Sequence, residues 1–246
     1  MLLKDKVCVL TGAANGLGQG TAFKFAREGA IVIVADIDSH GAAATVEKIT
    51  AQGGRALSID TDVRKRDDVD NLFAQVMDIY GRVDVLLNNA GVLDDAMLTK
   101  MTDEQFDNLM GVNLKGAFMC ARAAALIMTK QGSGSIINCS SIAGIYGNFG
   151  QTAYAASKAA LIGMMHCWAR ELGPKGIRVN AVAPGPMATI MMERVKEEAR
   201  QALINKISMK RFGNIEELAN VYTFLASDES SYVSGAVLEV SGDSNW

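Results

Sequence analysis

A tyrosine and a lysine four residues apart, Tyr154 and Lys158, form a pair suited to proton transfer. Residues spaced i and i+4 share one face of a helix, so the ammonium lies beside the phenol ring. A free tyrosine has a pKa of about 10 and is a poor base at neutral pH, but a neighbouring ammonium favours the phenolate. The spacing indicates a general acid or base, although the pair alone has low specificity because such pairs are frequent on helices.

Polar side chains that could bind a substrate oxygen follow two of the short runs that are expected to form strands. Ser140 and Ser141 follow the run 135–138, and Ser141 stands thirteen residues before Tyr154. The segment 88–91, Asn-Asn-Ala-Gly, follows the run 83–87, and Asn113 lies on a later helical pattern. Hydroxyl and amide groups in such positions can donate hydrogen bonds to a reacting oxygen.

A glycine-rich loop, Thr11-Gly12-Ala13-Ala14-Asn15-Gly16-Leu17-Gly18, joins the first strand pattern to the first helical pattern. Glycines let the backbone approach a pyrophosphate, which the free N–H groups of a helix N-terminus attract. The G-x-x-x-G-x-G spacing alone is also compatible with a plain tight connection or a nucleotide-binding methyltransferase. Its place between the first strand and helix favours a dinucleotide site.

The second strand pattern ends at Asp36, where an acidic side chain can accept hydrogen bonds from an adenosine ribose. A simple turn residue is the alternative. A 2′-phosphate would bring like charges together, and neither Arg nor Lys stands in the glycine loop or just after Asp36 to compensate. The sequence therefore predicts NAD(H) in preference to NADP(H).

Short apolar runs alternate with longer helical patterns, which predicts one α/β domain, residues 1–246, with a doubly wound parallel seven-stranded sheet and helices on both faces. Ligands of such sheets bind at the carboxyl ends of the strands. The expected strands are Val7–Leu10, Ile31–Ala35, Ala56–Asp60, Val83–Leu87, Ser135–Asn138, Arg178–Ala183 and Ala236–Val240; the expected helices are Leu17–Glu28, Gly41–Gln52, Arg66–Tyr80, Asp103–Lys130, Thr152–Leu172 and Glu216–Ala226.

Five ordered segments together resemble the short-chain dehydrogenase/reductase family over essentially the whole chain. They are T-G-A-A-N-G-L-G at 11–18, Asp-Val at 62–63, N-N-A-G at 88–91, S-x12-Y-x3-K at 141–158, and P-G-P-M-A-T at 184–189. The resemblance implies a Rossmann-type fold and hydride transfer between a nicotinamide cofactor and a secondary alcohol or ketone.

The resemblance also assigns a role to each matching residue. Tyr154 would be the general acid of reduction and base of oxidation, and Ser141 would polarise the substrate carbonyl, leaving Ser140 structural. Lys158 would lower the phenol pKa and hold the nicotinamide ribose, and Asn113 would anchor a water that links Lys158 to solvent. The residues expected to bind the dinucleotide are Gly12, Asn15, Gly16, Leu17, Gly18, Asp36, Ile37, Asp62, Val63, Asn89, Ala90, Gly91, Tyr154, Lys158, Pro184, Gly185, Met187 and Thr189.

The segment at about 186–210 is expected to form a lid over the substrate. It begins with Pro-Met-Ala-Thr-Ile-Met-Met, and methionines suit an adaptable apolar wall, although packing of these methionines into the core is an alternative. The expected substrate pocket contains Ser141, Tyr146, Phe149 and Met191. These side chains predict an apolar or mixed substrate that is not highly charged.

Within the family, the pattern is similar to the 3-oxoacyl-(acyl carrier protein) reductase branch. Asp36 departs from the phosphorylated cofactor typical of fatty-acid synthesis, and the loop 131–135 lacks basic residues for an acidic carrier protein. A hydroxyacyl or small-carbonyl dehydrogenase is an equal alternative, and a non-enzymatic NAD-binding sensor or scaffold is a third. The resemblance also implies a homotetramer, packed through the long helices and the C-terminal strand.

The composition excludes several other classes. A net charge of −3 argues against a nucleic-acid partner, and the N-terminus lacks a secretory signal. The apolar runs are too short to span a bilayer, which predicts a cytoplasmic protein without a membrane partner. Four cysteines stand singly and are expected to be buried thiols, and two distant histidines give no metal-ligand pattern, so no metal is expected.

Overall fold

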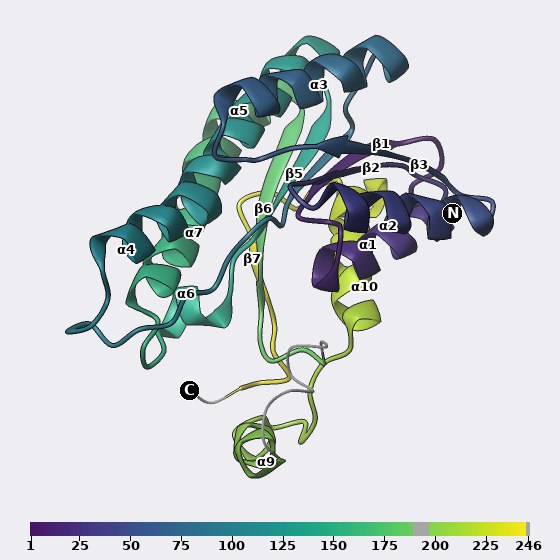
Figure 1. Ribbon diagram of the computed structural model, residues 1–246. Coiled ribbons are helices and arrows are strands. Elements are labelled where there is room, and N and C mark those ends of the chain that lie inside the picture. Colours follow the sequence, from purple (N-terminus) through teal and green to yellow (C-terminus); the bar gives the residue numbers. More distant parts are fainter. Residues whose placement is uncertain (189–196, 245–246) are drawn as a thin grey trace.

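In a computed structural model, which describes residues 1–188 and 197–244, seven parallel strands form one sheet between two layers of helices (Figure 1). Val and Ile dominate the strands, as expected where both faces of a parallel sheet are covered. This confirms the predicted fold class. The strands are β1 (Val7–Thr11), β2 (Ile31–Asp36), β3 (Arg55–Asp60), β4 (Val85–Asn88), β5 (Gly134–Cys139), β6 (Ile177–Pro184) and β7 (Val237–Val240).

Helices connect successive strands and cover both faces of the sheet. Side-chain oxygens of Asp38, Thr102 and Asn214 cap three of them by accepting backbone N–H groups, and the last two complete capping boxes. The helices are α1 (Gly16–Arg27), α2 (Ser39–Ala51), α3 (Arg66–Tyr80), α4 (Asp103–Met110), the π-helix η1 (Gly111–Gly116), α5 (Ala117–Gln131), α6 (Ile142–Tyr146), α7 (Thr152–Leu172), the 3₁₀ turn η2 (Gly173–Lys175), α9 (Glu197–Asn205), α10 (Ile215–Ala226) and the 3₁₀ turn η3 (Asp228–Ser230).

The strand order β3-β2-β1-β4-β5-β6-β7 reverses direction between β1 and β4. The chain first builds outward from β1 to β3 and then crosses back to place β4 on the other side of β1. The loops after these two strands diverge, because their helices lie on opposite faces. This is the switch point at which open α/β sheets bind ligands.

Side chains alternate between two apolar cores, one on each face of the sheet. Along β1, Cys8 and Leu10 join the core beneath α1, α2 and α10, whereas Val7 and Val9 join the core beneath α3, α5 and α7. Figure 1 shows these two groups of helices on opposite sides of the sheet. Burial on both faces holds the strand ends rigidly, so the loops that follow them are well positioned.

Observed and predicted elements differ in several bounds. The fourth strand begins at Val85, not at residue 83, and the Asp84 carboxylate just before it accepts a hydrogen bond from the Val7 N–H. The predicted helix Asp103–Lys130 contains the π-helix η1 within its length. Short helix α6 was missed, since five residues give no readable period.

Two features differ from the sequence expectation: the exposure of one cysteine and the apolar length of one helical stretch. Cys8, Cys120 and Cys139 are buried as expected, but Cys167 is exposed, because it lies on the outward face of α7. The helical stretch Asp103–Gln131 is long and apolar enough, by length and composition, to cross a bilayer. Its side chains include core residues of the α3, α5 and α7 layer, the usual source of such apolarity in a packed helix.

Candidate active site

The glycine loop has the shape that a pyrophosphate requires. Gly12 and Gly16 have positive φ angles of 66° and 56°, which favour glycine. A Cβ at Gly18 would lie 2.1 Å from the Gly12 carbonyl oxygen, so helix and turn pack too closely for any side chain. At Gly16 nothing lies within 4 Å of a Cβ position, which leaves open space beside the start of α1.

The N-terminus of α1 keeps its backbone donors available. Asn15, its N-cap residue, makes no side-chain capping bond, and the first turn contains no acidic residue. By contrast, the Asp38 carboxylate caps the N-terminus of α2 by accepting the Gly41 N–H. A helix terminus with free N–H groups and a positive dipole end is suited to an anion.

The ends of β1 and β4 are joined by side-chain hydrogen bonds. The Thr11 hydroxyl accepts from the N–H groups of Asn89 and Ala90, each at 3.1 Å. The Asn89 amide donates to the carbonyl oxygens of Thr11 and Gly12 at 3.1 and 2.8 Å. Asn89 and Ala90, which are expected to bind the dinucleotide, therefore lie against the glycine loop, and the two loops form one unit.

Asp36 lies at the end of β2 beside the same loop. Its Oδ2 accepts from the Ala14 N–H at 2.9 Å, and its Oδ1 accepts from the Asp38 N–H at 3.0 Å. The carboxylate is half-buried and retains lone pairs for further donors. Ribose hydroxyls are such donors, so the residues of this region fit an NAD adenosine.

Asp62, expected to bind the dinucleotide, forms hydrogen bonds with a neighbouring guanidinium. Arg64 donates from its Nε and Nη2 to both carboxylate oxygens, with an Nη2–Oδ2 distance of 2.8 Å, and its Nη1 donates to Asn108. Hydrogen bonding from Arg64 holds the pKa of Asp62 below its usual range. Asp62 is thus a buried anion fixed beside Val63, whose side chain packs against Gly116.

Lys158 ties α7 to the end of β5. Its Nζ donates to the Cys139 carbonyl at 2.7 Å, and its own carbonyl accepts from the Ser140 hydroxyl at 2.7 Å. The side chain is 3% exposed. This arrangement gives Ser140 the structural role expected for it, and it fixes the ammonium next to the strand end that carries Ser141.

Tyr154 lies one helical turn before this lysine. The Lys158 Nζ is 5.6 Å from the centre of its ring, so the two side chains share one face as the spacing predicts. Ser141 begins α6 and its Oγ accepts from the Ala143 N–H at 3.1 Å. Because the cap uses an oxygen lone pair, the hydroxyl proton remains available to a substrate oxygen.

Asn113 connects the β4 loop to α7. Its amide accepts from the Val92 N–H and donates to the Val92 carbonyl at 2.8 and 2.9 Å, and it reaches the Ser157 hydroxyl at 3.4 Å. Ser157 in turn donates to the Tyr154 carbonyl at 2.7 Å. Asn113 is fully buried in the π-helix η1, a local widening often found at functional sites.

Gly91 completes the convergence of these groups. A Cβ there would lie 3.4 Å from the Asn113 Oδ1 and 3.5 Å from the Lys158 Nζ. The ends of β4 and β5, the π-helix and α7 thus meet around one point. The predicted residues Gly91, Asn113, Tyr154 and Lys158 belong to one site, and Ser141 adjoins it through β5.

The predicted substrate-side residues are less tightly packed. Phe149 is 82% exposed, and the exposed Tyr146 donates a hydrogen bond to the Glu239 carboxylate at 2.9 Å. Met187 is buried and forms a bridge with Gly213. Thr189 and Met191, and with them part of the predicted lid 186–210, lie outside the described residues.

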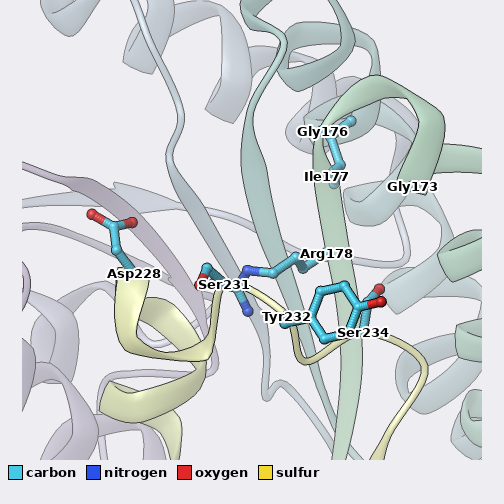
Figure 2. A pocket seen from close by; sticks show the side chains of 8 residues that line it. All are labelled: Gly173, Gly176, Ile177, Arg178, Asp228, Ser231, Tyr232 and Ser234. Atoms are coloured by element: carbon cyan, nitrogen blue, oxygen red, sulfur yellow. The ribbon is translucent and has the colours of Figure 1, made fainter.

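A separate cavity of about 580 Å³ opens at the other end of β6 (Figure 2). Its walls include Arg178, whose guanidinium donates to the carbonyls of Leu225 and Ser227 at the end of α10. Arg178 is the second residue of β6, so this cavity lies at the amino edge of the sheet. Within the described ranges no group of three or more potential metal ligands occurs.

Four contributors escaped the sequence prediction. The Cys139 carbonyl and the Ser157 hydroxyl act through ordinary residue types, so no pattern marks them. Thr11 is the first residue of the glycine loop and could have been assigned from that position. Glu239 lies far along the chain on β7, and only the fold brings it to Tyr146.

Comparison with known proteins agrees with this geometry. The family model described as Enoyl-(Acyl carrier protein) reductase matches residues 12–243. The chain is 48% identical over 242 residues to the 3-oxoacyl-[acyl-carrier-protein] reductase FabG of Thermotoga maritima, covering 98% of each chain. It is 39% identical to the (2S)-[(R)-hydroxy(phenyl)methyl]succinyl-CoA dehydrogenase subunit BbsD of Thauera aromatica, covering 98% of this chain and 97% of the relative.

Solved structures give the same result. A levodione reductase superposes with a TM-score of 0.93 at 34% identity, covering 98% of this chain and 97% of that one. The protein titled gox2181 gives a TM-score of 0.95 at 35% identity. These matches extend over the sheet, the glycine loop and the tyrosine–lysine helix. The chain belongs to the short-chain dehydrogenase/reductase family of oxidoreductases, which transfer hydride at a CH–OH or ketone carbon.

Proposed function

We propose that this enzyme is an NAD(H)-dependent oxidoreductase of secondary alcohols and ketones, with Tyr154 as the general acid and base. The observation that carries the proposal is the position of Lys158, held by the Cys139 carbonyl with its ammonium beside the Tyr154 ring. A bound nicotinamide supplies or accepts the hydride. The protein then has only to bind, orient and protonate the substrate oxygen.

The residues divide this task. In reduction, Tyr154 donates its phenolic proton to the developing alkoxide, and the Ser141 hydroxyl donates a hydrogen bond to the same oxygen. The Lys158 ammonium stabilises the tyrosinate left behind. Asn113 holds the Val92 backbone and reaches Ser157, so it fixes α7 relative to the β4 loop. Oxidation reverses these steps.

Asp36 supports NAD(H) as the cofactor. Its carboxylate is fixed by two backbone N–H groups and faces the loop that starts α1. Two ribose hydroxyls can donate to it, whereas a 2′-phosphate would meet a like charge. We propose that the other predicted residues also contact the dinucleotide. They extend from the glycine loop through Ile37 and Val63 to the Pro184–Gly185 turn.

The substrate proposed here is a hydroxyacyl compound or a small ketone. The second candidate is reduction of 3-oxoacyl groups on an acyl carrier protein. It is favoured by the full-length 48% identity to the Thermotoga maritima reductase. The relative from Thauera aromatica acts, by its name, on a CoA thioester. Both candidates require a ketone or secondary alcohol carbon beside Tyr154.

A single assay separates these candidates. Purified protein is given NADH or NADPH with ethyl acetoacetate, acetoacetyl-CoA, 3-oxoacyl carrier protein and simple ketones, and loss of reduced nicotinamide is followed by absorbance. We expect turnover of the small 3-oxo compounds with NADH. Dependence on carrier protein and NADPH would favour the second candidate, and tight NADH binding without any turnover would favour the sensor alternative.

We also propose a homotetramer that acts in the cytoplasm. Exposed apolar side chains lie along α4 and α5, namely Phe106, Phe118 and Leu126, and Tyr232 is fully exposed before β7. These are the regions through which the predicted assembly would pack. Sedimentation equilibrium tests the assembly, since a monomer mass would refute it.

A further inference from the structure

We propose that Glu239 is a specificity-determining residue that disfavours a free carboxylate on the 3-oxoacyl group, so that the enzyme selects 3-oxo esters, thioesters and ketones over 3-oxo acids. This inference rests on the proposed function and narrows its substrate class. It is carried by one cluster of contacts at the carboxyl edge of the sheet, involving Tyr146, Glu239 and Ser241.

Glu239 lies on the same face of the sheet as Tyr154. On a strand, residues two apart point to the same side. Val237, two residues earlier on β7, packs into the core that also contains Met165 of α7. Glu239 pairs in register with Ala183, directly before Pro184 at the end of β6. Its carboxylate is therefore on the α7 side and at the end of the sheet where substrate binds.

Two contacts fix this carboxylate between the substrate helix and the cofactor turn. The Tyr146 hydroxyl donates to Oε2 at 2.9 Å, and the Ser241 hydroxyl donates to Oε1 at 2.6 Å. Tyr146 ends α6, the helix that Ser141 begins. Ser241 abuts the turn after Pro184, because a Cβ on Gly185 would lie 2.8 Å from it.

Helix α6 itself is held close to the catalytic helix. A Cβ on Gly144 would come within 2.7 Å of the Lys158 carbonyl carbon and 2.8 Å of its Cβ. The backbone that carries Tyr146 is therefore fixed relative to the Tyr154–Lys158 helix, and the exposed Tyr146 side chain reaches Glu239 from it.

The charge of Glu239 is not neutralised by a salt bridge among the described residues. Asp243 adds a second negative charge nearby, and the two carboxylates together raise the pKa of Tyr146, with Glu239 the larger cause. Hydroxyl donors stabilise the carboxylate without removing its charge. A substrate carboxylate near Tyr154 therefore meets repulsion that a neutral ester does not.

The test compares an anion with its neutral ester. Acetoacetate and ethyl acetoacetate are assayed with NADH, and their binding to the protein saturated with NAD⁺ is measured by calorimetry. For Glu239→Gln we expect the acetoacetate-to-ester ratio, in kcat/KM and in affinity, to rise about tenfold at low salt, and the gain to shrink in about 0.5 M salt.

One variant serves as a matched control. Glu47→Gln makes the same charge change on the exposed surface of α2 and should leave the ratio within about twofold of wild type. Equal changes for both ligands in Glu239→Gln, or no binding of either ligand to the wild type, would overturn the inference. Calorimetric discrimination without turnover would instead count against the proposed function alone.

Discussion

The carboxyl edge of the sheet has two halves that are built differently. On the dinucleotide half, after β1, β2 and β4, polar side chains bond to neighbouring backbone: Thr11 with Asn89, and Asp36 with Ala14. On the substrate half, after β5 and β6, the aromatic side chains of Tyr146 and Phe149 are exposed. Among the described residues, backbone hydrogen bonds join the loops of the first half, whereas the second half exposes aromatic side chains.

The difference follows from what each half must bind. The same dinucleotide binds in every turnover, and a site whose backbone is already ordered loses less conformational entropy on binding. A substrate must bind and a product must dissociate in each turnover, and exposed or mobile pocket residues allow both steps. The residues proposed to be catalytic lie between the halves, and Lys158 is hydrogen-bonded to the backbone at the end of β5, as Asn89 is to that of β1.

Removing the proton donor should have the largest effect, because it should impair catalysis while leaving dinucleotide binding almost unchanged. Tyr154→Phe should lower kcat by about 1,000-fold, because the alkoxide loses its acid, while affinity for NADH changes by less than about threefold. Steady-state kinetics measure the first quantity and NADH fluorescence titration the second. A variant with near wild-type turnover would remove Tyr154 from the mechanism.

A change confined to the dinucleotide half should alter cofactor choice alone. In Asp36→Ala with Ile37→Arg, a guanidinium replaces the carboxylate at the ribose, so the ratio of kcat/KM for NADPH over NADH should rise about 100-fold. The KM for ethyl acetoacetate should stay constant. Unaltered cofactor preference would show that Asp36 does not face the ribose.

Packing between α6, on the substrate half, and α7 can be broken at Gly144. Gly144→Val should cost about 2 to 3 kcal/mol in the free energy of unfolding, because the new side chain meets the Lys158 backbone, and activity should fall with it. Urea denaturation gives the stability. Gly163→Ala, on the neighbouring helix α7, is the control: nothing lies within 4 Å of its Cβ position, and it should stabilise by about 0.5 to 1 kcal/mol.

The smallest effect should be a pH-dependent one at Asp62. Its carboxyl pKa is lowered in the fold by Arg64, so the pair stabilises the protein above the unfolded pKa of about 3.9 and loses that contribution as pH falls through the folded value. Asp62→Asn should lower stability by about 1 kcal/mol at pH 7, since Arg64 is partly solvated. The gap between wild type and variant should close in strongly acidic buffer; a constant gap contradicts the assignment.

Much of the site could be predicted because its signals are local. The glycine loop needs positive φ at Gly12 and Gly16, and only residue type limits such angles. Tyr154 and Lys158 share a helix face because the period of a helix is fixed. Alternating apolar runs indicated the parallel sheet, and its carboxyl edge followed from the direction of the chain.

Other features depend on residues far apart in the chain, and no local pattern records them. The Cys139 carbonyl that holds Lys158, the path from Asn113 through Ser157 to Tyr154, and the contact of Tyr146 with Glu239 each join separate elements. The sequence by itself determined the fold class and the chemical groups available, because residue type and spacing act within one element. The tertiary structure alone decided which of those groups meet and which charges remain unneutralised, because packing sets the distances on which electrostatic and hydrogen-bond energies depend.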